Sequence, residues 1–435
     1  MYAEEVFSSL DGIDRNEYVI ATYYYELESR DLLKHIAELG LEQTTGTWIG
    51  VPEETPEVRE KHAARVLGVY EVPDYEMDMP PNVDRRTCVA QIAFPQINFG
   101  PQIPMLLTTV IGNISMMGRL KLLDLTFPEK FVSSFSGPKF GIDGIRKLLN
   151  IEKRPLLCNM IKPCTGIPPE VGAKLFYKAA VGGVDIVKDD ELIADAPFSH
   201  IEERVKAFMA AEKRAYEKKG ERTLYAVNIT DRVDKLLENA QKAIEVGANC
   251  LMLNYLTVGI SALRMLAEER SIQVPILAHL DFAGTMYESH NSGISSHLIL
   301  GKLPRLAGTD MVVYPCPYAK FRFIREKHIK IALAHRMSLF HLKPIFPMPG
   351  GGVHPGMLPT LMEDLGTDWI MGAGGAIHGH PMGATAGAIA CRQAIDAMMA
   401  NVPLEEAINE HKELKAAIEA WGIVGKSEVT TTGIQ

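Results

Sequence analysis

The chain has 435 residues, of which 47% are hydrophobic and 23% are charged, and its formal net charge is −9. This composition is typical of a globular protein, and the length predicts about two domains. The acidic balance argues against a basic surface for binding nucleic acid.

Cysteine usage and apolar patterning indicate the compartment. The six cysteines lack CxxC spacing, which favours reduced thiols. The N-terminal segment "MYAEEVFSSLDG" has no signal-peptide pattern. The longest apolar stretch, at 103–118, is interrupted by polar residues and too short to span a bilayer. We therefore expect a cytoplasmic protein without a membrane partner.

The first part of the chain mixes strand and helix patterns without a regular repeat. Residues 17–27 are rich in aromatic and β-branched side chains and predict a strand. Residues 31–42 predict a helix with Asp31 as its N-cap. Further strands are predicted at 65–72 and 87–95, and a short helix or buried segment at 102–112. Together these elements predict an α+β domain over residues 1–140.

From about residue 150 onward, short apolar runs alternate with helical patterns such as that of residues 232–248. Eight runs predict strands, at 155–161, 183–187, 223–229, 250–256, 274–280, 310–315, 343–348 and 368–373. This alternation matches a (β/α)8 TIM barrel, here over residues 141–435 with a C-terminal helix within 404–422. An open, doubly wound parallel sheet is the alternative.

The second predicted barrel strand ends in a run of charge, Lys188, Asp189, Asp190 and Glu191. Because side chains alternate along a strand, Lys188 and Asp190 should share one side, and Asp189 should point toward a helix or solvent. Inward carboxylates suit Mg²⁺, and a lysine carbamate formed with CO₂ would supply a third oxygen ligand. A buried Lys–Asp salt bridge is the alternative.

Other reactive side chains come near the ends of predicted strands, where such barrels build their active sites. Lys162 follows the first strand and could be an acid–base group or a surface lysine. His279 lies in the fifth strand and could contact substrate or be a satisfied core histidine. We expect Lys320, beyond the sixth strand, to be solvated.

Glycine-rich turns follow the seventh and eighth strands, and include Gly352, Gly374 and Gly375. Backbone N–H groups in such turns often hold a phosphate, although the glycines could also merely permit tight turns. His378 and His380 lie in the second of these turns, where a structural role is expected and not metal ligation.

Several motifs, in the same order along the chain, resemble those of the large subunit of Rubisco. They are "LEQTTGTW" (41–48), "INFGPQIPMLLTTVIGN" (97–113), "FSGPKFGIDGIRKLL" (135–149), "IKPCTG" (161–166), "GGVDIVKDDE" (182–191) and "GHPMG" (379–383). The resemblance covers nearly the whole chain and implies an N-terminal α+β domain followed by a (β/α)8 barrel. It also implies a homodimer, or a higher assembly of dimers, in which each N-terminal domain completes the partner's active site.

The resemblance also implies roles for individual residues. Lys188 would be carbamylated by CO₂ and, with Asp190 and Glu191, would bind Mg²⁺. Lys162 matches a lysine of proton transfer, and His279 matches a histidine of the fifth strand. The residues that match substrate contacts are Glu42, Thr47, Trp48 and Asn113 in the N-terminal domain and Gly352, Gly374 and Gly375 at one phosphate site.

Departures from the family pattern argue against carboxylation. Carboxylating members hold a second phosphate with an arginine, a histidine and a serine, where this chain has Leu280, Val313 and Gly350. Replacing a guanidinium by leucine removes the main electrostatic partner of a phosphate, which favours a monophosphate substrate. Cys164 stands in place of a second lysine of the first strand, and Lys320 falls near the family's mobile-loop lysine.

The pattern resembles the non-carboxylating Rubisco-like proteins. Residues 351–366 and 374–384 are most similar to the methionine-salvage enolase for 2,3-diketo-5-methylthiopentyl 1-phosphate, which has a lysine base where this chain has Asn113. We therefore expect a Mg²⁺-dependent enolase or isomerase that acts on a phosphorylated keto-sugar or diketone through an enediolate. The alternatives are decarboxylation of a β-keto sugar-acid phosphate, ribulose-bisphosphate carboxylation, and a non-catalytic homologue.

Overall fold

The computed structural model describes residues 4–28, 31–46, 50–321 and 323–425, and the chain forms two compact units. The first unit extends to Phe135 and also includes Phe282–Ile299. The second unit comprises Ser136–Asp281 and the residues from Leu300 onward. The domain boundary at residue 140 stays a prediction.

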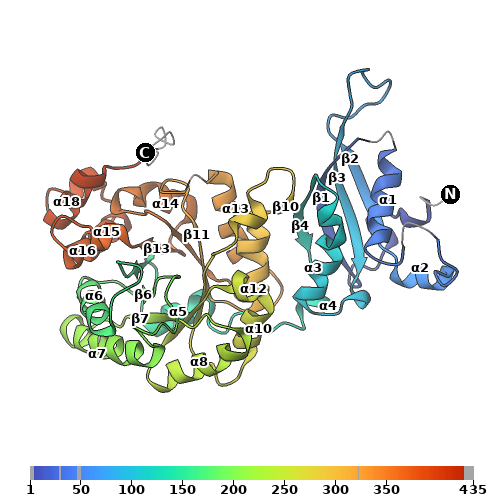
Figure 1. Ribbon diagram of the computed structural model, residues 1–435. Coiled ribbons are helices and arrows are strands. Elements are labelled where there is room, and N and C mark those ends of the chain that lie inside the picture. Colours follow the sequence, from blue (N-terminus) through green and yellow to red (C-terminus); the bar gives the residue numbers. More distant parts are fainter. Residues whose placement is uncertain (1–3, 29–30, 47–49, 322, 426–435) are drawn as a thin grey trace. The chain divides into compact units, whose positions relative to one another are not determined.

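A five-stranded sheet in the order β10-β4-β1-β3-β2 forms the centre of the first unit (Figure 1). Its strands are β1 (Tyr18–Leu27), β2 (Arg65–Glu71), β3 (Arg86–Pro95), β4 (Leu120–Thr126) and β10 (Gly293–Ile294). Its helices are α1 (Leu32–Glu42), α2 (Pro56–His62), α3 (Ile103–Ile111), α4 (Glu129–Val132) and α11 (Gly284–Tyr287). Every second side chain of β1 is buried, from Val19 to Leu27, as expected for a strand with one face in the core.

The start of α1 is fixed by Asp31, whose carboxylate accepts a hydrogen bond from the backbone N–H of Lys34 at 3.0 Å. This bond satisfies one of the free N–H groups at the helix N-terminus. The predicted helix and its N-cap are therefore confirmed, as are the predicted strands of this unit.

β10 belongs to residues 282–299, a segment that follows the fifth barrel strand and returns to the first unit. It pairs in parallel with β4, at Gly293 with Lys121 and at Ile294 with Leu122. The Lys121 ammonium also donates to the carbonyl oxygens of Tyr287 and Ser289. No sequence pattern predicts this strand, because two residues are too few to show alternation.

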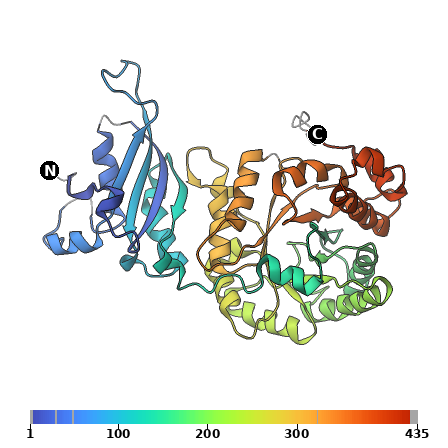
Figure 2. The ribbon, with the colours of Figure 1, turned by 180° about the vertical axis from the view of Figure 1, so that it is seen from behind.

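Eight parallel strands form the second unit's sheet, in the order β12-β11-β9-β8-β7-β6-β5-β13. They are β5 (Leu156–Met160), β6 (Ile186–Lys188), β7 (Leu224–Asn228), β8 (Cys250–Leu253), β9 (Ile276–Ala278), β11 (Met311–Pro315), β12 (Phe346–Gly350) and β13 (Ile370–Ala373). The helices are α5 (Gly141–Leu149), α6 (Pro169–Val181), α7 (Ile201–Lys219), α8 (Leu236–Glu245), α9 (Tyr255–Val258), α10 (Ile260–Glu268), α12 (Leu303–Ala307), α13 (Arg325–Arg336), α14 (Leu358–Leu365), α15 (Gly375–His378), α16 (Ala384–Met399), α17 (Leu404–Ala407) and α18 (Lys412–Trp421). Figures 1 and 2 show helices placed around this sheet, which confirms the predicted barrel.

The barrel closes where β12 and β13 approach each other at Gly372. A Cβ atom at this position would lie 2.8 Å from the carbonyl oxygen of Pro349 and 3.0 Å from the Met160 side chain. Only glycine permits such a close approach of two strands. The interior is filled by alternate apolar side chains of the strands, including Met160, Met311 and Val313.

Two predicted elements differ from the structure. The run at 250–256 is not one strand: β8 ends at Leu253 and α9 begins at Tyr255. The backbone N–H of Asn254 donates to the Thr230 hydroxyl at 2.9 Å, so the chain turns there. The C-terminal helical region is divided into α17 and α18, and the side chain of Gln393 on α16 accepts from the Leu414 N–H at the start of α18.

No helix among the described residues is long and apolar enough to cross a membrane.

Two buried histidines on α13 predict a loss of stability in acid. Burial lowers the pKa of His335 to about 3 and that of His328 to about 4. Because the unfolded chain binds these protons near pH 6.5, stability is full above that pH and is lost as the pH falls toward the folded pKa values. We expect a fall from pH 7.5 to pH 5 to cost about 2 kcal/mol for each histidine.

Thermal unfolding monitored by circular dichroism between pH 7.5 and pH 5 measures this loss. In His335→Gln, an amide N–H can still donate to the Leu300 carbonyl, which the histidine Nε2 contacts at 2.7 Å. This variant should show a shallower pH dependence than the wild type. An unchanged slope would contradict the assignment to His335.

Candidate active site

β6 ends in a buried lysine. β6 pairs with β5 and β7, all three of its residues are buried, and Lys188 has no exposed surface. The Lys188 ammonium donates to the Glu191 carboxylate at 3.1 Å and to the carbonyl oxygen of Asp189 at 2.7 Å. The lysine thus reaches the start of the loop after β6.

Asp189 points away from this lysine, as the alternation along the strand predicts. Its carboxylate pairs with Arg204 on α7 at 3.0 Å and accepts from the Tyr225 hydroxyl at 2.7 Å. It also accepts from the backbone N–H of Asn228 at 2.9 Å. Asp189 and Arg204 are 3% and 2% exposed, so this is a fully buried ion pair that anchors the loop to α7 and β7.

Asp190 forms an ion pair with Lys162, which follows β5. The Lys162 ammonium lies 2.6 Å from the Asp190 carboxylate and 2.9 Å from the Cys164 sulfur. Burial works against the charge of Lys162, but the hydrogen bonds to Asp190 and Cys164 outweigh it and raise its pKa above the ordinary value. Lys162 is therefore an ammonium at neutral pH and can donate a proton.

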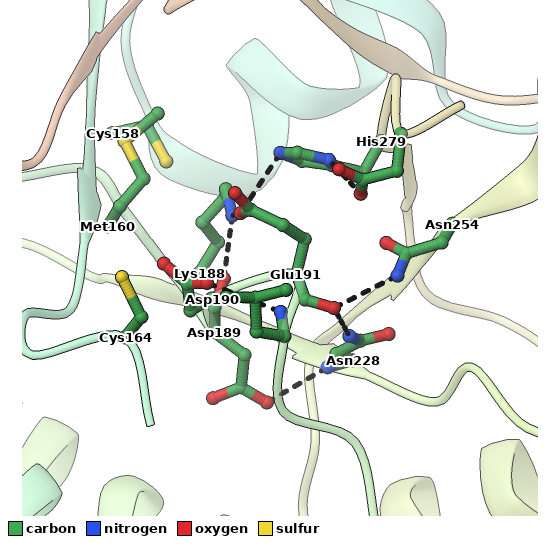
Figure 3. A network of polar contacts seen from close by, with 12 residues as sticks. Cys158, Met160, Cys164, Lys188, Asp189, Asp190, Glu191, Asn228, Asn254 and His279 are labelled. Carbon is green, nitrogen blue, oxygen red and sulfur yellow. Dashed lines mark hydrogen bonds and ion pairs between the residues drawn. The ribbon is translucent and has the colours of Figure 1, made fainter. Parts of the chain in front are cut away.

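Glu191 lies between Lys188 and His279. The His279 Nε2 is 3.3 Å from the Glu191 carboxylate, and its Nδ1 is 2.7 Å from that of Asp281. Burial opposes the charge of Glu191, yet the charges of Lys188 and His279 hold its pKa at about 2. Figure 3 shows these side chains in one polar network, with His279 on the far side of Glu191 from Asp189.

Two asparagines that are not among the predicted site residues complete this network. The side-chain N–H groups of Asn228 and Asn254 both donate to the backbone carbonyl of Glu191, at 3.2 and 3.0 Å (Figure 3). Each is a polar residue at the end of a buried strand, β7 or β8, and that position is the signal that could have found them.

The glycine turns lie at the ends of β12 and β13. Gly351 and Gly352 have φ angles of 92° and 101°, which strongly favour glycine. Gly374 lies beside Lys162, because a Cβ atom there would be 3.3 Å from the lysine Cε. Gly375 begins α15, and nothing lies within 4 Å of where its Cβ would be. The eighth-strand turn therefore has open space next to the lysine.

The two histidines of this turn have structural partners. The His378 Nε2 is 3.1 Å from the Asn159 side-chain oxygen, behind β5. His380 is hydrogen-bonded to the Glu413 carbonyl at 3.0 Å and accepts from the Met382 N–H at 3.1 Å. These contacts agree with the expected structural role.

The positions that depart from the carboxylase pattern are apolar, and two of them, Val313 and Gly350, are neighbours. Val313 lies in the barrel core, and Leu280 packs against that core. A Cβ atom at Gly350 would lie 3.5 Å from the Val313 side chain and 3.3 Å from that of Met160. None of the three positions carries a cationic side chain.

The remaining predicted residues are placed as follows. Lys320 is exposed, and its backbone N–H donates to the Gly351 carbonyl at 2.8 Å. Glu42 ends α1 and Asn113 begins a short 3₁₀ turn, both exposed on the first unit. Thr47 and Trp48 lie outside the described residues. Among the described residues, no three His, Cys, Asp or Glu side chains form a group that could hold a metal ion.

Comparison with known proteins assigns a family to both parts of the chain. The chain matches the family "Ribulose bisphosphate carboxylase large chain, N-terminal domain" over residues 7–131 and the corresponding "catalytic domain" over residues 141–421. A ribulose bisphosphate carboxylase-like protein of Archaeoglobus fulgidus is 57% identical over 390 residues, which cover 89% of each chain. A 2,3-diketo-5-methylthiopentyl-1-phosphate enolase of Geobacillus thermodenitrificans is 40% identical and covers 93% of this chain and 98% of its own.

Solved structures of the same family also resemble this chain over nearly its whole length. A rubisco-like protein from Alicyclobacillus acidocaldarius superimposes with a TM-score of 0.86 at 36% identity, over 93% of this chain and 100% of that one. A dimeric archaeal Rubisco from Hyperthermus butylicus superimposes with a TM-score of 0.84 at 30% identity, over 98% of this chain and 100% of that one.

Proposed function

This chain belongs to the Rubisco large-chain family as a Rubisco-like protein, and from that membership we propose that it is a Mg²⁺-dependent, non-carboxylating enolase or isomerase of a phosphorylated keto compound. The observation that carries the proposal is the cluster of Lys162, Lys188, Asp190, Glu191 and His279 at the ends of β5, β6 and β9. The 40% identical enolase relative supports the same reaction class.

The donor set of this cluster fits Mg²⁺. Asp190 and Glu191 supply hard oxygen ligands, and Lys188 as a carbamate would supply another in place of its positive charge. When bound, Mg²⁺ would polarise the substrate carbonyl and make the neighbouring C–H acidic. Lys188 is fully buried, and its one carboxylate partner among the described residues is Glu191, which the carbamate role would make a fellow ligand of the metal.

The other residues of the site would transfer the proton and hold the substrate. Lys162 would return a proton to the substrate, because its ammonium lies next to Asp190 and to the open turn at Gly374. The base that removes the α-proton would be the carbamate on Lys188. His279, held between two carboxylates, would orient the substrate oxygens. The backbones of Gly352, Gly374 and Gly375 would hold the phosphate.

The partner subunit would complete the site. We expect a homodimer, or an assembly of dimers, in which Glu42, Thr47, Trp48 and Asn113 of one chain reach the barrel of the other. The dimeric Hyperthermus butylicus relative supports this expectation. Sedimentation of the purified protein at micromolar concentration tests it, and a monomer would contradict it.

Proton exchange in D₂O, followed by NMR over a panel of phosphorylated 2-ketoses and diketones, tests the reaction. With Mg²⁺ and bicarbonate present, at least one compound should lose its α-proton. If none does, the enolisation proposal is wrong. Release of CO₂ from a β-keto sugar-acid phosphate would favour the decarboxylase alternative, and fixation of labelled CO₂ onto ribulose bisphosphate would favour a carboxylase.

The apolar residues Leu280, Val313 and Gly350 predict that a second phosphate adds no affinity. A second phosphate would meet no cation at these positions, so we expect monophosphates and bisphosphates of one ketose to bind within about threefold of each other. Leu280→Arg should bind the bisphosphate about tenfold more tightly, because a hydrogen bond to a charged group adds 1.5–3 kcal/mol. Isothermal titration calorimetry measures both affinities.

Leu148→Arg is the matched control, because Leu148 on α5 is exposed and has no proposed role. It should leave the affinity ratio unchanged. A wild-type protein that already prefers the bisphosphate by tenfold would contradict the monophosphate proposal.

A further inference from the structure

Asn254 presents a buried hydrogen-bond acceptor that the protein leaves unused. The residue is 8% exposed, and its amide orientation is fixed because Nδ2 donates to the Glu191 carbonyl at 3.0 Å. The side-chain oxygen Oδ1 must then face the other way. It is fully buried and has no hydrogen-bond partner among the described residues. Such orphaned acceptors are rare in folded proteins.

Asn228 makes the contrast clear. It donates to the same carbonyl of Glu191, at 3.2 Å. Its own Oδ1, however, accepts from the backbone N–H and the hydroxyl of Thr230, at 3.1 and 2.6 Å. Holding the Glu191 carbonyl therefore does not require an unpaired acceptor, and the unpaired oxygen is particular to Asn254.

The surroundings of Asn254 Oδ1 belong to the candidate site. Figure 3 shows this oxygen on the side of the amide nearer the Glu191 side chain and His279. Both ring nitrogens of His279 are engaged by the carboxylates of Glu191 and Asp281, and the Lys188 ammonium is engaged by Glu191. The carboxylates only accept, and no donor of the described residues, including the third N–H of Lys188, is hydrogen-bonded to this oxygen. We therefore look for its donor in a ligand.

We propose that Asn254 Oδ1 accepts a hydrogen bond from an O–H group of the bound ligand, either a hydroxyl of the substrate or a water molecule that is held with it. The inference rests on the proposed function and narrows it, because a substrate hydroxyl at this point identifies a hydroxyketone phosphate. Asn254 would then bind substrate directly, whereas Asn228 only positions the Glu191 backbone.

Isothermal titration calorimetry with two probes tests this assignment, in the presence of Mg²⁺ and bicarbonate. Dihydroxyacetone phosphate and acetol phosphate differ by one hydroxyl group. The proteins are the wild type, Asn254→Ala and the matched variant Asn228→Ala, which loses the same contact to Glu191 and leaves the Thr230 donors unpaired. A change in affinity that is caused by the lost hydrogen bond to the Glu191 carbonyl should appear in both variants, so a difference between them reports on Asn254 Oδ1.

If a substrate hydroxyl is the donor, the wild type should bind dihydroxyacetone phosphate about fivefold or more tightly than acetol phosphate. Asn254→Ala should lose this preference, and Asn228→Ala should keep it. If a water molecule is the donor, Asn254→Ala should bind both probes about fivefold more weakly than Asn228→Ala does. Melting temperatures supply a second readout, on which Asn228→Ala should be at least as destabilised as Asn254→Ala.

Equal affinities of the two variants for both probes would overturn the proposal. A crystal structure of the wild type with Mg²⁺, bicarbonate and dihydroxyacetone phosphate keeps it testable even if Asn254→Ala fails to fold. A hydroxyl or water oxygen at hydrogen-bond distance from Asn254 Oδ1 supports the proposal, and an empty position there refutes it. A wild type that binds neither probe and exchanges no α-proton counts against the proposed function itself.

Discussion

Lys188→Ala should lose substrate proton exchange by about a thousandfold or more, because Mg²⁺ supplies several kcal/mol and each 1.4 kcal/mol is a factor of ten. The variant lacks the group that would become the third oxygen ligand and leaves Glu191 without its buried lysine partner. NMR in D₂O measures the exchange. Wild-type protein with ¹³C-bicarbonate and Mg²⁺ should also show a carbamate resonance, and the variant should show none.

Lys153→Ala is the control, since Lys153 is an exposed lysine that precedes β5 and has no proposed role. It should exchange substrate protons at the wild-type rate. If Lys188→Ala keeps its activity, the carbamate role is wrong. If it loses activity while the wild type shows no carbamate signal, Lys188 is a structural partner of Glu191 and not a metal ligand.

Arg204→Met should lower the stability of the protein by about 3–5 kcal/mol, because it leaves the buried Asp189 carboxylate without its ion pair. For a chain of 435 residues the loss corresponds to a fall in melting temperature of about 3–6 °C. Arg204 also donates to the carbonyl oxygens of Ser199 and Ala194, so the loop after β6 should loosen and Mg²⁺ binding should weaken. Thermal unfolding and Mg²⁺ titration measure the two effects.

The matched variant is Arg232→Met, which breaks the exposed pair with Asp234. An exposed pair contributes less than about 1 kcal/mol, so this variant should melt close to the wild type. The double variant Arg204→Met/Asp189→Leu removes both buried charges and should recover part of the lost stability. An Arg204→Met protein as stable as the wild type would show that the pair adds nothing net.

The regular features of this protein could be predicted from the sequence because they follow from periodicity. The alternation of apolar runs with helices gives the barrel, and the alternation of side chains along β6 places Asp189 away from Lys188. The cap of α1 is a local hydrogen bond, and a local pattern identifies it. The proximity of Lys162, Lys188 and His279 follows from the rule that parallel strands bring their carboxyl ends together.

Features that depend on contacts distant in the sequence could not be predicted. Asn254 contacts the backbone of Glu191, 63 residues earlier, and a carbonyl oxygen carries no sequence identity. The strand formed by Gly293 and Ile294 is recognisable only beside β4. The end of β8 at Leu253 depends on a hydroxyl of Thr230 in the previous loop. Roles in catalysis and in the assembly of two chains remain proposals for experiment.

The return of residues 282–299 to the first unit has a consequence for biosynthesis. Domains generally fold as units during translation, starting from the N-terminus. Here the edge of β4 gains its β10 partner only after the ribosome has made about two thirds of the chain. Until then β4 is an open strand edge, which can pair with other chains. We expect a fragment that ends at residue 140 to aggregate during expression, and chaperones to matter most before β10 is synthesised.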